Sequence, residues 1–340
     1  MELGLTSFAE TPPDPVTGEA MSHGERLRNV IAEVEKAEEV GLDVYGLGEH
    51  HRPDMAASAP AIAMAAAAGR TERIRLSSAV IVLSSADPVR TFQDFSTIDL
   101  ISSGRAELMV GRGSFIESFP LFGYSLEDYD ELFIEKLGLL LEIRDNERVT
   151  WSGQFRPPLH DQPVYPRPHQ DPLPVWVAVG GSPESMIRAG RLGLPVALAI
   201  IGGDPARFGV LADLYRRSLV EGGHDPTEIP LAVHGLGYIA DSNEEAAEEV
   251  YASFAATMTR IGKERGWPPL TREQFDEMRS PEGSLVLGDA ETVAAKILRW
   301  REILGISRFM LHNAGAVPHQ LSLRSIEYLG TKVAPIVNAT

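Results

Sequence analysis

The chain has 340 residues, of which 44% are hydrophobic and 23% are charged. This composition is typical of a globular protein with enough apolar material for a core. The 48 acidic residues outnumber the 31 lysines and arginines, which gives a formal net charge of -17. That charge disfavours nucleic acid and anionic membranes as partners. The absence of cysteine excludes disulfides, thiolate metal sites and a cysteine nucleophile.

The amino-terminal residues 1–8 have neither the basic leader nor the apolar region of a secretory signal. No stretch of the sequence approaches the roughly 20 apolar residues needed to span a bilayer. We therefore expect a cytoplasmic protein. The missing signal carries this expectation, since a chain without cysteine suits any compartment.

Apolar runs alternate with helical patterns along the first half of the chain. An apolar run over 2–8 predicts a strand, and a Pro-rich loop separates it from a helix that begins after Ser22, with Glu25 three residues on, and stops at Gly41. The segments that follow predict, in order, a strand (44–48), a helix (60–69), a strand rich in β-branched residues (74–83), a helix opened by Asp87 and Pro88, a strand (106–110) and a helix (126–144).

The second half repeats the alternation after a Pro-dense excursion over 151–174. Its predicted elements are a strand (175–179), a helix (184–192), a strand (195–201), a helix (205–221), a strand (231–240) and a helix (243–265). A second excursion over 266–287 precedes a helix (290–304), a strand (306–312) and a last helix (320–333).

Eight strands separated by helices predict a parallel sheet with right-handed crossovers. Eight repeats in 340 residues suit a closed (β/α)₈ TIM barrel, which routinely reaches this length as a single domain, here spanning 1–340. A doubly wound open sheet lacks its Gly-rich phosphate turn after the first strand. The Gly111-Arg112-Gly113 segment begins such a motif, but Phe115 and Ile116 follow where a third glycine belongs.

Catalytic groups of such barrels follow the carboxyl ends of the strands. The second predicted strand ends at Glu49-His50-His51, and histidine exchanges protons near neutral pH. Glu49 and one histidine could instead make structural hydrogen bonds. A metal site, as in a zinc hydrolase, is the weaker alternative, because no second pair of histidines at ligand spacing accompanies the cluster.

The third strand carries only small side chains from Ser77 to Ala79, which would let a flat ring approach the backbone. Taken alone, the segment is explained more simply by tight packing inside the barrel. Arg112, at the end of the fourth strand, could hold a phosphate through charged hydrogen bonds or pair with Glu107 or Glu117.

The fifth strand ends in Gly180-Gly181-Ser182-Pro183-Glu184-Ser185 and a helix follows at once. Two glycines allow close approach, Ser182 can cap the helix, and Pro183 suits its first position. Free N–H groups and serine hydroxyls at a helix start form an anion site, although an ordinary capped helix would look the same. Arg112 could grip the same phosphate from the other side.

Together these segments resemble the bacterial luciferase-like family of flavin-dependent monooxygenases, over nearly the whole chain. The resemblance is carried by five segments in order: Glu49-His50-His51; Ser78-Ala79-Val80-Ile81-Val82-Leu83 with Pro88-Val89-Arg90; Ile101-Ser102-Ser103-Gly104-Arg105 with Gly111-Arg112-Gly113; Gly181-Ser182-Pro183-Glu184-Ser185; and Gly288-Asp289-Ala290-Glu291-Thr292-Val293.

The resemblance implies a role for ten residues. His50 matches the family's active-site histidine, and Ala79-Val80 matches a bulge, often with a non-proline cis peptide, that contacts the flavin ring. The remaining matches are phosphate contacts at Arg112, Ser182 and Ser185, backbone access at Gly181, and residues beside the ring or substrate at Ile200, Ile201 and Gly202.

The implied activity is oxidation of a small organic substrate by oxygen, with reduced flavin mononucleotide (FMN) as cofactor. A separate flavin reductase would supply the reduced cofactor, because the chain has no Rossmann nicotinamide site. A deazaflavin-dependent dehydrogenase on the same barrel and a non-catalytic flavin-binding protein are the alternatives. The family's motifs do not separate these branches cleanly, although Ser77-Ser78 and Gly180-Gly181 resemble the FMN branch.

Two further expectations concern surfaces. The Ala-rich helix over 60–69, with Phe92 and Phe95 on the next helix, offers apolar surface and predicts a homodimer. The substrate pocket is expected to be shaped by four loops, over 11–18, 115–124, 151–174 and 266–287.

Overall fold

The computed structural model describes residues 1–15 and 17–339, and a closed barrel of parallel strands forms its centre. β1 pairs with both β2 and β12, and β9 pairs with β10, so the ring of strands has no free edge. The predicted (β/α)₈ barrel is confirmed. Its strands are β1 (Glu2–Ser7), β2 (Val44–Leu47), β3 (Arg75–Ser78), β5 (Ala106–Gly111), β8 (Val175–Val179), β9 (Val196–Ile200), β10 (Leu231–Ile239) and β12 (Arg308–Asn313).

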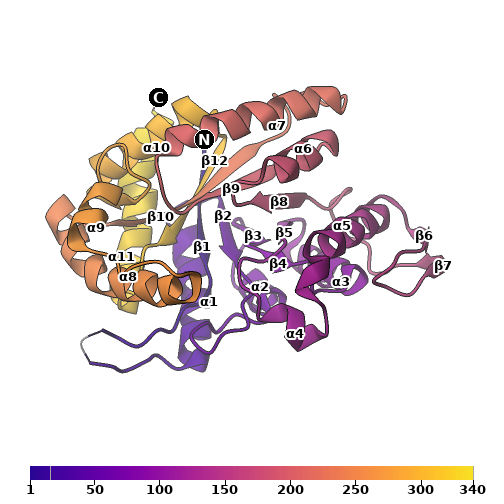
Figure 1. Ribbon diagram of the computed structural model, residues 1–340, viewed down its shortest axis with the longest axis horizontal. Coiled ribbons are helices and arrows are strands. Elements are labelled where there is room, and N and C mark those ends of the chain that lie inside the picture. The colour runs from indigo at the N-terminus through magenta and orange to yellow at the C-terminus, as the bar shows by residue number, and fades with distance from the viewer. Residues whose placement is uncertain (16, 340) are drawn as a thin grey trace.

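Helices follow the strands and form the outer layer (Figure 1). Alternate strand residues point outward and pack with the helices in the main core, while the inward set fills the barrel. The layer comprises α1 (His23–Glu39), α2 (Pro60–Ala68), α3 (Pro88–Ser102), α5 (Tyr129–Asp145), α6 (Pro183–Arg191), α7 (Gly209–Glu221), α8 (Asn243–Arg265), α10 (Ala290–Leu304) and α11 (His319–Tyr328).

Several segments differ from the sequence prediction. The third predicted strand is split into β3 and β4 (Ile81–Val82) at the Ala79–Val80 peptide bond, which is cis. The 151–174 excursion belongs to a hairpin of β6 (Arg148–Trp151) and β7 (Leu159–Pro163), which projects beside α5 (Figure 1). Short elements also occupy predicted loops or follow the last helix: α4 (Ser118–Phe122), α9 (Arg272–Met278), β11 (Val286–Gly288) and α12 (Ala334–Asn338).

The surface expectation needs one correction. Phe92 and Phe95 are fully buried in the main core, because both lie on the face of α3 that packs against the barrel. The exposed apolar residues of this region are instead Ile62 on α2, at 74% exposure, and Leu100 and Ile101 on α3.

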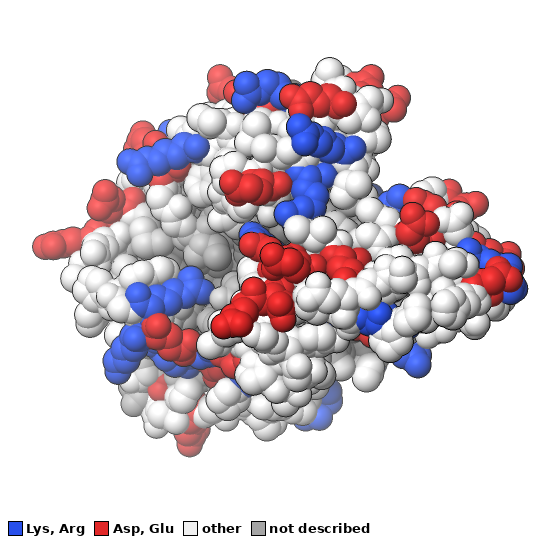
Figure 2. Space-filling model, turned by 45° about the vertical axis from the view of Figure 1, so that its right-hand side comes forward, with Lys and Arg blue, Asp and Glu red and all other residues white. Residues whose placement is uncertain are grey.

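Acidic and basic side chains are interspersed over the face shown in Figure 2. Several acidic side chains gather at the centre of this face, beside a hollow. Among the described residues, no helix combines the length and the apolarity that a membrane span requires.

A buried ion pair lies near the amino-terminal end of the barrel. Arg308 of β12 and Glu107 of β5 are almost fully buried, with Nη1–Oε2 and Nη2–Oε1 distances of 2.6 and 2.9 Å. The guanidinium also contacts Glu2, at 2.7 Å, and lies over the ring of Trp176. The pair therefore ties opposite sides of the barrel together.

We expect Glu107→Ala to lower the free energy of unfolding by about 3 kcal/mol, because it leaves a buried guanidinium with only part of its partners. Urea unfolding followed by circular dichroism measures the loss. The double variant Glu107→Leu with Arg308→Met is the control, since it removes both charges. It should unfold at a higher urea concentration than Glu107→Ala. Equal stability of the wild type and Glu107→Ala would contradict this role.

Candidate active site

A cavity of about 350 Å³ opens at the carboxyl ends of the barrel strands, and we call it the barrel cavity. Small and apolar side chains from several strands form much of its wall, which suits a flat ligand. Residues of the wall are Thr6, Phe8, Glu49, His50, His51, Ala79, Val80, Val82, Met109, Gly111, Arg112, Gly113, Ser114, Phe115, Glu117, Ser118, Tyr129, Ala178, Val179, Gly180, Ser182, Ala197, Ala199, Ile201, His234 and Met310.

The structure brings most of the predicted site residues to this cavity. His50, Ala79 and Val80 line it, as do Arg112, Ser182 and Ile201. The loop after β5 and the turn before α6, which the sequence expects to share one phosphate, therefore open onto the same space as His50.

Four predicted residues do not line the wall. Ile200 is fully buried in the main core, because alternation along β9 turns its side chain away from the barrel interior. Ser185 is also buried, and its N–H donates to Oγ of Ser182 at 3.3 Å. Gly181 lies between two wall residues with a φ of +119°, a conformation that favours glycine, and Gly202 follows wall residue Ile201.

Two of the four loops expected to shape a pocket line the barrel cavity or a second cavity beside it. Phe115 and Ser118 of the 115–124 loop line the barrel cavity, and Thr11 to Pro15 line a second cavity described below. The β6–β7 hairpin and α9 belong to neither wall. The 151–174 segment instead pairs with itself and projects from the barrel (Figure 1).

His50 is held between two aromatic rings at the end of β2. Its ring centroid lies 4.5 Å from that of Phe8 and 5.3 Å from that of Phe115. The backbone N–H of His50 donates to the backbone carbonyl of Ala57. Burial lowers the pKa of His50 to about 4, against the opposing pull of Glu10. The imidazole is therefore neutral at neutral pH and can accept a proton.

The neighbours of His50 have the structural roles that the sequence left open. Oε2 of Glu49 accepts the N–H of Val82 at 2.9 Å, and Oε1 pairs with Nε2 of His51 at 2.8 Å. Glu49 thus fixes the backbone of β4 and the ring of His51. The side chain of His50, by contrast, makes ring contacts and no side-chain hydrogen bond with the described residues.

The wall of the barrel cavity opposite His50 carries positively charged groups that could bind an anion. Arg112 pairs with Asp130 at 2.5 Å and lies over the ring of Tyr129. Arg188 of α6 has a buried Nη1 without a partner among the described residues, and its pKa is lowered first by burial and then by Arg112. Both guanidinium groups lie beside the start of α6, where Ser182 caps the helix, and the nearby carboxylates are those of Asp130 and Glu184. This donor set fits the phosphate of FMN.

Sequence reasoning missed the residues that line the barrel interior. Thr6, Met109, His234 and Met310 all belong to the wall, and each lies within a strand, not after its end. A polar residue inside an apolar strand, such as His234, is the one signal that could have found them. Arg188 was missed because it lies inside α6, beyond the strand-end segment in which the sequence predicts phosphate contacts.

The family model described as luciferase-like monooxygenase matches residues 1–307. The alkanal monooxygenase alpha chain of the Kryptophanaron alfredi symbiont is 28% identical over 267 residues, which cover 75% of this chain and 70% of that protein.

Three solved structures share the fold over nearly all of both chains. Monooxygenase RslO1 from Streptomyces bottropensis superposes with a TM-score of 0.84 at 23% identity, covering 98% of this chain and 99% of that chain. The oxygenating constituent of 3,6-diketocamphane monooxygenase from Pseudomonas putida, in complex with FMN, gives 0.78 at 19% identity and 98% coverage of each chain. An F420-dependent secondary alcohol dehydrogenase gives 0.77 at 18% identity, covering 99% and 98%.

These likenesses accompany a barrel whose carboxyl-end cavity is lined by residues of four of the five segments on which the resemblance rests. A family model that spans most of the chain settles the kinship, and the chain belongs to the luciferase-like monooxygenase family.

Proposed function

We propose that this protein is an FMN-dependent monooxygenase that uses reduced FMN and oxygen to oxidise a small organic substrate. One observation carries the proposal. A single cavity has Arg112 and the capped start of α6 on one side, with Arg188 close to Arg112, and a neutral, buried imidazole with small apolar residues on the other. The separation of an anion site from an apolar floor suits a phosphate joined to a flat ring.

The chain's residues would share the work as follows. Arg112, Arg188 and the start of α6 bind the phosphate, while Ala79 and Val80 give the ring an apolar floor. Bound reduced FMN supplies the reaction with oxygen. Phe8 and Phe115 limit the entry of water, and His50 accepts or returns a proton at an imidazole nitrogen.

A titration with oxidised FMN, followed by visible absorption and flavin fluorescence, tests the proposal directly. We expect saturable binding at one site per chain, and oxygen uptake once a flavin reductase and a nicotinamide cofactor are added. Such a reductase is the proposed transient partner. Saturable FMN binding without oxygen uptake on any tested substrate would instead indicate a flavin carrier.

A deazaflavin-dependent dehydrogenase is the second candidate. The likeness to the F420-dependent alcohol dehydrogenase supports it, since that structure covers the chain as fully as the monooxygenases do. Parallel titrations with FMN and a deazaflavin cofactor separate the two. Tighter binding of the deazaflavin, with reduction of that cofactor by an alcohol, would overturn the FMN proposal.

We also propose a homodimer formed through α2 and α3. Ile62, Leu100 and Ile101 expose apolar side chains on these two adjoining helices. We expect Ile62→Glu to convert the protein to a monomer at micromolar concentration, as measured by light scattering. Val220→Glu on α7 is the control, because Val220 is also an exposed apolar residue but lies outside this patch. A monomeric wild type would contradict the proposal.

A further inference from the structure

Four polar side chains form a continuous hydrogen-bonded row across the top of the barrel. Oε1 of Glu10 lies 2.6 Å from Nε2 of His312, and Nδ1 of His312 lies 3.0 Å from Oγ1 of Thr6. The same Oγ1 lies 3.0 Å from Nδ1 of His234. These residues come from the loop after β1, from β12, from β1 and from β10, so only the closed barrel brings them together. We call them the polar row.

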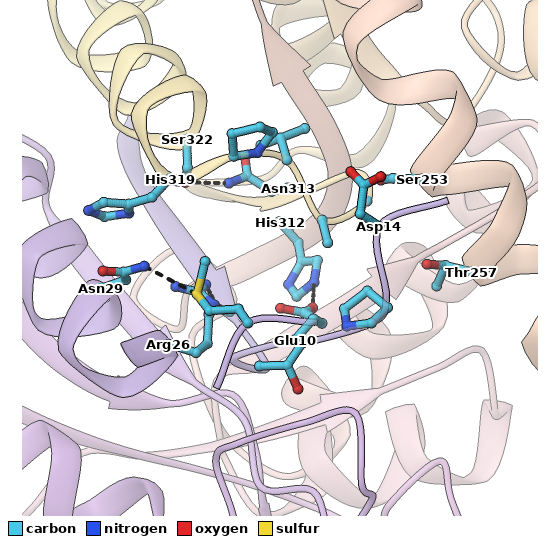
Figure 3. A pocket seen from close by; sticks show the side chains of 18 of the residues that line it. Glu10, Asp14, Arg26, Asn29, Ser253, Thr257, His312, Asn313, His319 and Ser322 are labelled. Atoms are coloured by element: carbon cyan, nitrogen blue, oxygen red, sulfur yellow. Dashed lines mark hydrogen bonds and ion pairs between the residues drawn. The ribbon is translucent and has the colours of Figure 1, made fainter. Parts of the chain in front are cut away.

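The two ends of the polar row open onto different cavities. His234 lines the barrel cavity. Glu10 and His312 line a second cavity of about 360 Å³ between the loop after β1, α1, α8 and α11, which we call the side cavity. Figure 3 shows Glu10 and His312 joined within it, with Asn313 and Thr257 on its walls. Thr6 lines both cavities and stands at the point where they meet.

An aromatic ring packs against one side of the polar row. The ring of Phe8 lies 4.4 Å from that of His312 and 6.2 Å from that of His234, and it also contacts His50. Phe8 therefore covers the row on the side of His50. Within the described residues, Nδ1 is the nitrogen of His234 that makes a hydrogen bond, which leaves Nε2 for the barrel cavity.

The surroundings of the row determine the charges of His234 and Glu10. Burial lowers the pKa of His234 to about 3, so this imidazole is neutral. Burial raises the pKa of Glu10, but His312 and Arg26 outweigh it and bring the pKa to about 2, so Glu10 is ionised. Two other titratable groups interact with the row: Arg26, whose charge lowers the pKa of Glu10, and His50, whose pKa is affected by Glu10 and His312.

We propose that the polar row is a proton-transfer chain that links the side cavity to the barrel cavity, an inference that rests on the proposed flavin chemistry there. When His312 is protonated, its Nδ1–H donates to Thr6, and Thr6 donates to Nδ1 of His234, which then carries its proton on Nε2. His234 gives that Nε2 proton to a group in the barrel cavity. At the same time the Thr6 hydroxyl proton moves to Nδ1 of His234, and the Nδ1 proton of His312 moves to Thr6. The cavity group gains one proton, His312 loses one, and Glu10 keeps its charge throughout.

Thr6 is the residue to test, because it joins the two histidines. Thr6→Val keeps the shape of the side chain and removes the hydroxyl, whereas Thr6→Ser keeps the hydroxyl. In apo protein labelled with ¹⁵N-histidine, we expect His234 to show the Nε2–H tautomer in the wild type and in Thr6→Ser. In Thr6→Val, where Nδ1 has lost its donor, the two tautomers should mix. Glu10→Gln is a second variant, for use if Thr6→Val does not fold. It should shift the Nε2 resonance of His312, because the carboxylate that contacts this nitrogen is replaced by a neutral amide.

Reoxidation of bound reduced FMN by oxygen in stopped flow gives the functional readout. Thr6→Val and Glu10→Gln should slow its proton-dependent phase by about 100-fold, the lower end of the range for a lost general acid, while Thr6→Ser stays near the wild type. The solvent deuterium effect on that phase should shrink in Thr6→Val.

The outcomes separate the inference from the proposed function. If FMN does not bind, the proposed function fails, and the tautomer of His234 still reports on the row. If FMN binds but Thr6→Val matches the wild type in both readouts, the proton-transfer chain is overturned. Equal slowing by Thr6→Ser and Thr6→Val would also overturn it, since a packing role alone then explains Thr6.

Discussion

His50→Ala is expected to lower turnover by about 10²- to 10⁴-fold while the affinity for FMN stays nearly unchanged. The magnitude is that of a lost general acid or base. The cofactor's phosphate would be held at the opposite wall, by Arg112 and the start of α6, so the binding energy does not depend on the imidazole. Turnover is measured as oxygen uptake with a flavin reductase, and affinity by absorption titration.

His50→Gln is the control for packing, because it keeps a polar side chain between Phe8 and Phe115. It should fold like the wild type and lose turnover like His50→Ala. Since burial lowers the pKa of His50 to about 4, the imidazole is neutral throughout the range from pH 5 to 8 and loses its accepting role only as the pH falls through about 4. A turnover profile with an inflection near pH 6.5 that vanishes in His50→Gln would contradict this assignment.

Arg112→Ala is expected to weaken FMN binding by roughly 10- to 100-fold, the effect of about 1.5–3 kcal/mol for a hydrogen bond between charged groups. Removal of Arg112 leaves Arg188 as the remaining guanidinium of the anion site. Absorption titrations of the wild type and the variant measure the ratio.

Riboflavin is the matched control for this prediction, because it keeps the ring and lacks the phosphate. Its affinity should be the same in Arg112→Ala and in the wild type. Asp130 pairs with Arg112 at 2.5 Å and competes with an anion for it, so Asp130→Asn should tighten FMN binding by up to about fivefold. Equal weakening of riboflavin and FMN by Arg112→Ala would show that Arg112 does not bind the phosphate.

The order of elements was readable from local patterns because each helix and strand is specified by its own residues. The helix over 243–265 and the strand over 175–179 were predicted with their observed bounds, and in the structure Ser242 caps that helix and the strand is an uninterrupted apolar run. The 151–174 segment was not resolved into a hairpin. Its pairing of β6 with β7 depends on contacts within a polar, Pro-rich segment that has no clear alternation.

The same distinction between local pattern and tertiary contact applies to the residues of the site. Strand ends are visible in a sequence, so His50, Ala79, Arg112 and Ser182 could be predicted from position and motif. Thr6, His234 and His312 lie on three strands far apart in the chain, and no local pattern relates them. Their meeting is a consequence of barrel closure.

The sequence by itself determined a parallel barrel, the segments at its carboxyl end and the kinship with a flavin-using family, because periodicity and short motifs are local properties. Only the tertiary structure decided that Arg188 lies near Arg112 and that Phe92 and Phe95 are buried. It also decided that a row of polar groups lies between two cavities. The physical reason is that strand register and helix orientation fix which side chains face one another, and both are set by packing of the whole barrel.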